Sequence, residues 1–124
     1  MSEIDPLKYP LGLFLKPEAI TAEHLTAWIA TIAEFPQKIA ALTETLTEET
    51  LTKTYRPDGW TIRQLVHHCA DSHMNAFIRF KLALTEEAPK IKPYFEDQWA
   101  ELPDTRSAAI SSSWLRFCRF FCRA

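Results

Sequence analysis

The sequence predicts an all-α protein, a helical bundle in which two long amphipathic helices carry most of the core. Apolar residues recur at helical spacing in two long stretches, residues 22–46 and 61–85. Each stretch begins at a threonine that can cap a helix, Thr21 or Thr61. No segment has the strict alternation that is typical of a strand, so a sheet is not expected.

The first helix should follow an irregular arm. Residues 1–19 contain three prolines, which disfavour regular structure, so this segment is expected to lie over the domain as an arm. Thr21 can cap a helix whose apolar stripe begins within residues 25–32. Pro36 should kink that helix, and the helical pattern resumes to about residue 46.

The second helix has a strongly signalled start. The stretch "RPDG" (residues 56–59) has the composition of a tight turn, in which glycine tolerates a positive φ. Thr61 and Gln64 then form a capping box, and the pattern runs to about Thr85 before "EEAPKIKP" ends it. Residues 86–106 should be a long connection, with one or two helical turns in "FEDQWAEL".

Three of the four histidines lie within "WTIRQLVHHCADSHMN", residues 60–75. Because an α-helix advances about 100° per residue, helical phase sorts their directions. One narrow polar strip runs along four turns beside the apolar face, and Asp71 lies on its edge. This polar strip consists of Gln64, His68, Ser72, Asn75 and Arg79.

Helical phase gives each histidine a different interpretation. His67 shares a sector with Arg63 and is expected to face solvent. His73 lies among apolar residues, which predicts a half-buried histidine bonded to a carbonyl. His68 is on the polar strip, where bundles build metal and substrate sites, so it is either a metal ligand or a hydrogen-bonded interior histidine. Asp71 and Ser72 could support a metal site or contact substrate, as could Gln64, Asn75 and Arg79.

The region from "YRPDGWTIRQLVHHCADSHMN" to "AELPD" resembles the DinB-like superfamily, in its YfiT branch of candidate metal-dependent hydrolases. The stretches "RFKLALTEE" and "IKPY" continue the resemblance, as do the earlier "YPLG" and "WI…P" segments, so it covers about residues 8–106. The resemblance implies a four-helix bundle, of which residues 1–106 form the first half, two long helices and a long connection. It also implies a homodimer.

The resemblance further implies one divalent metal per subunit, zinc or nickel, bound by three histidines. The second histidine of the HH pair, His68, is one ligand, and an HxxxH pair on the fourth helix supplies the others. The metal would activate water for hydrolysis. Relatives that act on low-molecular-weight thiols suggest a metal-dependent thiol transferase as the alternative. This chain contains no HxxxH, so we expect an incomplete site and weak or absent activity.

Composition excludes several classes of function. The chain has 124 residues, of which 47% are hydrophobic, enough for one globular domain. A net charge of −2 argues against nucleic acid as the main partner, and no apolar run approaches the length of a membrane span. With no signal-peptide pattern and three cysteines, a cytoplasmic protein without a disulfide framework is expected. A small-molecule substrate is the expected partner.

Residues 107–124, "SAAISSSWLRFCRFFCRA", form a C-terminal tail of different composition. The tail holds three arginines, two cysteines and no acidic residue. It is interpreted as out-of-frame sequence that follows a truncated bundle. A cationic amphipathic helix is the alternative, and Cys118 and Cys122 at i, i+4 spacing could then bind a metal. A further alternative is a non-catalytic helical interaction module with the tail as its contact surface.

Overall fold

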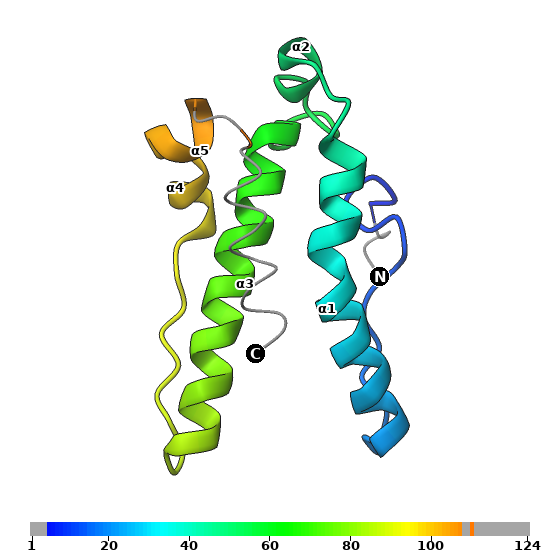
Figure 1. Ribbon diagram of the computed structural model, residues 1–124, viewed down its shortest axis with the longest axis vertical. Helices are drawn as coiled ribbons and strands as arrows, with labels where there is room; N and C mark the ends of the chain where they lie inside the picture. The colour runs from blue at the N-terminus through cyan, green and yellow to red at the C-terminus, as the bar shows by residue number, and fades with distance from the viewer. Residues whose placement is uncertain (1–4, 108–109, 111–124) are drawn as a thin grey trace.

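The computed structural model describes residues 5–107 and residue 110. Two long helices, α1 (Ala22–Thr43) and α3 (Ile62–Thr85), lie side by side and run antiparallel (Figure 1). Three short helices accompany them: α2 (Glu48–Leu51), α4 (Glu96–Ala100) and α5 (Pro103–Ser107). The described part of the chain is therefore helical, with one isolated bridge between Thr54 and Thr61 in place of any strand. This agrees with the predicted fold class.

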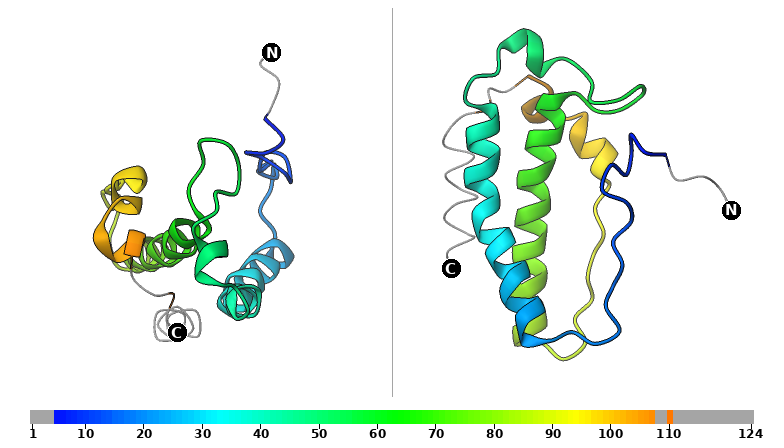
Figure 2. Two further views of the ribbon diagram at one scale, coloured as in Figure 1. Left: turned by 90° about the horizontal axis from the view of Figure 1, so that it is seen from above. Right: turned by 90° about the vertical axis from the view of Figure 1, so that its right-hand side faces the viewer.

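Helix α1 begins where its capping residues place it. The His24 amide donates to the Thr21 hydroxyl, and the Thr21 amide donates to the His24 ring, so both halves of a capping box are present. The arm that precedes α1 contacts it through Phe14, whose ring meets Trp28 edge-on with 6.2 Å between centroids. Figure 2 shows this arm running along the molecule to the start of α1.

The two long helices meet at the middle of α1. Pro36 lies inside that helix and is buried, while the neighbouring Phe35 ring stacks on His73 of α3 with 4.9 Å between centroids. The predicted end of this helix, residue 46, is a little late, because α1 stops at Thr43.

The core is small and centred on the first half of α3. Its buried apolar side chains are Val66 and Ala70 of α3, Leu51 of α2 and Ala100 of α4. The short helices α2, α4 and α5 all pack against α3. Neither α2 nor α5, of four and five residues, was predicted.

The turn before α3 differs from expectation in one detail. The Gly59 amide donates to the Arg56 carbonyl at 3.1 Å, which confirms the turn. The positive φ belongs to Asp58, at 56°, and not to the glycine. Gly59 is needed because a Cβ there would lie 2.7 Å from Arg56 Cγ. The glycine provides room for close packing rather than an unusual backbone angle.

After α3 the chain turns back and runs along that helix in the opposite direction, as residues 86–95 (Figures 1 and 2). This returning segment leads into α4, which begins as predicted within "FEDQWAEL". Within residues 5–107, no helix combines the length and the apolar character needed to cross a membrane.

Candidate functional site

The site is built on the first three turns of α3, whose phase is fixed by its cap. The Gln64 amide donates to the Thr61 hydroxyl, and the Gln64 side-chain oxygen accepts from the Thr61 amide at 3.0 Å. This reciprocal pair confirms the predicted capping box and starts the helix at Ile62.

Gln64 also joins α3 to α4. Its Nε2 donates to the Ala100 carbonyl at 2.8 Å and to Glu101 Oε1 at 2.9 Å. The side chain is only 8% exposed, and both ends of its amide are used by the fold. Gln64 therefore holds the end of the returning segment against α3, and in this arrangement it supports the site from one end of the polar strip.

His68 lies one turn further along, between aromatic rings. The centroid of its ring is 4.7 Å from that of Trp60 and 6.5 Å from that of Tyr94. Burial lowers the pKa of His68, while the negative charges of Glu96 and Asp97 act in the opposite direction. A lowered pKa keeps the imidazole neutral near pH 7, which is the form that binds a metal ion.

Tyr94 closes over the polar strip from the returning segment. Burial raises the pKa of its hydroxyl, and the charges of Glu96 and Asp71 add to that effect. A hydrogen bond from Ser72 and the charge of Arg79 act the other way. Tyr94 thus faces both the His68 end and the Arg79 end of the strip. Sequence reasoning missed it, because its place depends on the path of the returning segment.

Asp71, on the edge of the strip, has a strongly shifted carboxyl group. Burial raises its pKa from the ordinary 3.8 to about 6, with a contribution from the negative charge of Asp104 on α5. A carboxyl group that titrates near neutral pH can accept or release a proton under physiological conditions. Such perturbed groups cluster at functional sites, which supports the placement of a site on this face of α3.

The remaining members of the strip, Asn75 and Arg79, line a groove beside α3. The Asn75 amide donates to the Asp71 carbonyl at 2.8 Å, which directs its side chain along the helix. All five predicted strip residues therefore lie on the face of α3 next to the returning segment and α4, with His68 near Tyr94, Arg79 towards the far end, and Ser72 exposed.

The other histidines of the cluster take different positions. The prediction for His73 is confirmed: its ring is half-buried and Nδ1 lies 2.7 Å from the Cys69 carbonyl. The prediction that His67 faces solvent is wrong, because that residue is only 4% exposed. Arg63 of the same sector is buried as well and binds Glu48 at the start of α2. Helical phase assigned this sector to water because it is polar, and it could not show that Arg63 would pair with a residue of α2.

The described residues supply a suitable first ligand but not a full metal site. His68 offers a neutral nitrogen donor, as described above. No group of three or more His, Cys, Asp or Glu side chains within the described part of the chain could hold a metal ion. Burial raises the pKa of the Cys69 thiol, so this cysteine does not provide a ready thiolate. The tail with Cys118 and Cys122 lies outside the described residues.

Comparisons with known proteins identify the family of this chain. The pattern of the DinB superfamily (DinB_2) matches residues 31–118. A protein of Bacillus pumilus (strain SAFR-032), named as a candidate metal-dependent hydrolase, is 55% identical over 107 residues, covering 86% of this chain and 61% of that protein. YfiT of Bacillus subtilis (strain 168), named likewise, is 49% identical over 86% of this chain and 60% of its own length.

A solved structure shows the same fold. The structure of YfiT from Bacillus subtilis, described as a probable metal-dependent hydrolase with an unusual four-helix bundle topology, matches with a TM-score of 0.87 and 42% identity. The match covers 96% of this chain and 67% of that one. The chain spans about 60% of the length of the curated relatives it matches. By sequence and by fold, the chain belongs to the DinB superfamily.

Proposed function

We propose that this protein is a metal-dependent hydrolase that acts on a small molecule, with His68 as one ligand of a divalent ion, zinc or nickel. The observation that carries the proposal is the environment of His68, a neutral, half-buried imidazole on a polar strip beside two groups of raised pKa, Asp71 and Tyr94. The names of the relatives, candidate metal-dependent hydrolases, support the reaction class and favour it over thiol transfer.

The residues on this face suit hydrolysis. A bound divalent ion lowers the pKa of water, so that hydroxide is available near neutral pH. Asp71, with a pKa of about 6, is ionised at pH 7 and can accept a proton. The raised pKa of Tyr94 keeps its hydroxyl protonated, so that it can donate a hydrogen bond to developing negative charge.

Two of the three expected ligands are not present in this sequence, which has no HxxxH pair. We therefore propose that this chain binds the metal weakly and hydrolyses its substrate slowly. One histidine alone does not reach the three protein ligands that are usual in catalytic zinc sites.

Cobalt(II) tests the role of His68, because the paramagnetic ion broadens NMR signals near it. The ring centroids of Trp60 and His68 are 4.7 Å apart. We therefore expect the indole signal of Trp60 to broaden at a lower Co²⁺ concentration than the indole signal of Trp28. The variant His68→Ala should abolish this selectivity. His24→Gln is the matched control, because His24 lies at the start of α1 and should not be required.

Hydrolysis is measured on a panel of small esters and amides with zinc or nickel added and with a chelator. Metal-stimulated turnover that is lost in His68→Ala supports the proposal. Selective Co²⁺ binding that survives in His68→Ala would overturn the assignment of the ligand. No selective binding in either protein would favour the non-catalytic interaction module.

A further inference from the structure

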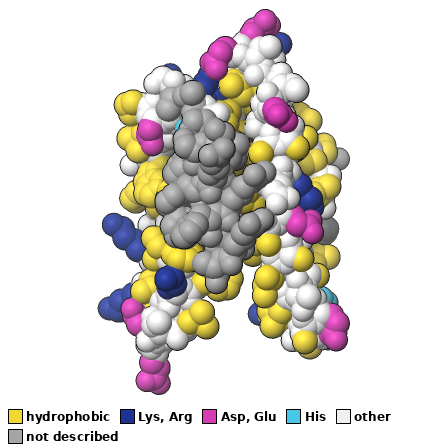
Figure 3. Space-filling model, in the orientation of Figure 1, with side chains coloured by type: hydrophobic (Ala, Val, Ile, Leu, Met, Phe, Trp, Pro, Cys, Tyr) yellow, Lys and Arg dark blue, Asp and Glu magenta, His cyan; other side chains and the backbone are white. Residues whose placement is uncertain are grey.

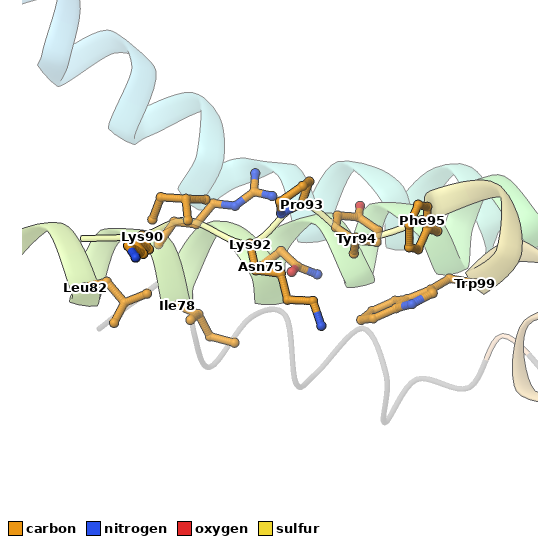
Figure 4. Close-up of a pocket in the computed structure, with 11 residues that line it drawn as sticks. Asn75, Ile78, Leu82, Lys90, Lys92, Pro93, Tyr94, Phe95 and Trp99 are labelled. Carbon is orange, nitrogen blue, oxygen red and sulfur yellow. The ribbon is translucent and has the colours of Figure 1, made fainter. Parts of the chain in front are cut away.

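A groove separates the second half of α3 from the returning segment. Its volume is about 300 Å³, at the lower end of the range for small-molecule pockets. Figure 4 shows side chains from both walls, with the Trp99 ring at one end. The labelled wall residues from α3 are Asn75, Ile78 and Leu82, and those from the returning segment are Lys90, Lys92, Pro93, Tyr94 and Phe95.

The charges that line this groove have one sign. Arg79, Lys90 and Lys92 are among its lining residues, and no carboxylate is. Within the described part of the chain, no salt bridge or hydrogen bond uses the charged group of any of these three side chains. Three cations around one concave surface, none neutralised by an acid, produce a positive potential there.

The opposite charge lies at the other end of the site. Glu96 and Asp97 act on His68, and Asp71 lies on the adjoining edge of α3, where the charge of Asp104 on α5 acts on it. Tyr94 stands between the two ends, since it feels both the carboxylates and the charge of Arg79. The site is therefore polarised along α3, with acidic groups around His68 and basic groups in the groove.

We propose that the groove binds the anionic group of a small molecule, a carboxylate or a phosphate. The guanidinium of Arg79 is the main contact, because its planar fork matches both anions with two hydrogen bonds. Lys92 adds charge, and Ile78 with Trp99 contacts an apolar part of the ligand. Exposed lysines alone are usually only solvated. Arg79 differs from them because it is half-buried in the wall of a groove.

This inference rests on the proposed function in one respect, because it assigns an acidic substrate to the hydrolytic site that the groove adjoins. Binding in the groove itself requires no metal. The experiment is therefore done with a chelator present, so that a failure of the metal assignment leaves its outcome unchanged.

Phenylacetate and phenyl phosphate are suitable probes, with phenylacetamide as the neutral match for phenylacetate. Each is titrated into ¹⁵N-labelled protein, and the indole signal of Trp99 is followed. This signal is assigned as the one that is missing from the spectrum of Trp99→Phe. We expect both anions to shift this signal saturably, and phenylacetamide to bind at least tenfold more weakly than phenylacetate. Stronger binding of phenyl phosphate would identify phosphate as the preferred anion, and stronger binding of phenylacetate would identify carboxylate.

Arg79→Gln should weaken binding of both anions by about tenfold or more and leave that of phenylacetamide unchanged. Lys92→Gln should weaken the anions severalfold and serves as the second variant if Arg79→Gln does not fold. Lys38→Gln, which removes an exposed lysine ion-paired on α1, is the matched control and should have no effect. Equal affinity for phenylacetate and phenylacetamide would overturn the proposal, as would unchanged anion binding in both groove variants.

Discussion

At the scale of single residues, the candidate site depends on how burial shifts proton affinities. His68 loses proton affinity on burial, whereas Asp71 and Tyr94 gain it. Desolvation disfavours whichever form is charged, so one environment moves a base and two acids in opposite directions. All three groups are consequently biased towards their neutral forms on the same face of α3.

The raised pKa of Asp71 can be tested through its effect on the stability of the fold. Its folded pKa of about 6 lies above the ordinary 3.8, so the folded chain binds the proton more tightly than the unfolded chain. Stability should therefore fall as pH rises from about 4 to about 6, and ionised Asp71 should destabilise the fold above that range. In metal-free protein, Asp71→Asn should raise the free energy of unfolding by about 1 kcal/mol at pH 7 and only slightly near pH 4. This is less than a fully buried carboxyl would give, because water partly screens the charge.

Urea denaturation of both proteins at pH 4 and pH 7 measures this difference. An NMR titration of the Asp71 carboxyl carbon gives its pKa directly. A midpoint near 4, or an equal stability change at both pH values, would contradict the expectation.

At the scale of elements, the contact between Gln64 and the end of α4 fixes the returning segment over the site. Gln64→Glu separates this contact from the helix cap, because the carboxylate can still accept from the Thr61 amide but cannot donate to the Ala100 carbonyl. It also places a negative charge beside Glu101. We expect the free energy of unfolding to fall by about 1–3 kcal/mol at pH 7, since a buried carbonyl is left without its donor.

Chemical denaturation measures that loss, and part of it should be recovered at pH 4, where the introduced glutamic acid can donate again. Thr61→Ala is the control, because it removes the capping hydroxyl and leaves the bonds to α4 in place. An equal loss at both pH values in Gln64→Glu would show that the contact with α4 contributes little.

At the scale of the whole molecule, both long helices carry apolar side chains that the described part of the chain leaves exposed. Figure 3 shows hydrophobic side chains on both sides of the molecule, over α1 and over α3. On α1, Leu25, Ile29 and Ile32 form a stripe, and Ile29 is 64% exposed. On α3, Phe80 and Leu84 are exposed, Leu84 by 83%. Fully burying one such side chain contributes roughly 1.5–3 kcal/mol, so covering these faces is strongly favourable.

We therefore expect the purified chain to associate, with a homodimer as the smallest species, rather than to remain a 14.3 kDa monomer. Light scattering coupled to size-exclusion chromatography measures the mass. The double variant Leu25→Gln, Ile29→Gln should shift the protein towards the monomer, and the exposed-site variant Lys53→Gln should not. A monodisperse monomer with a cooperative melt would contradict this expectation.

Local patterns in the sequence determined the two long helices, the capping box of Thr61 and Gln64, the polar strip with His68, and the carbonyl-bonded His73. Each of these depends on residues at most about four turns apart on one helix, where the regular geometry of the helix fixes relative direction. Family membership was also recognisable, from the stretch around Gly59 to Asn75, and the comparisons show it.

Only the tertiary structure decided which side chains are covered and which distant residues join the site. Burial of His67 and Arg63 was not predicted, because helical phase within α3 cannot show contacts with other elements, such as the ion pair of Arg63 with Glu48 of α2. The sequence likewise did not predict Tyr94 as a residue of the site, or the groove in which Lys90 and Lys92 line the surface with Arg79. Their positions follow from the path of a non-helical segment along α3, and no periodicity encodes the path of such a segment.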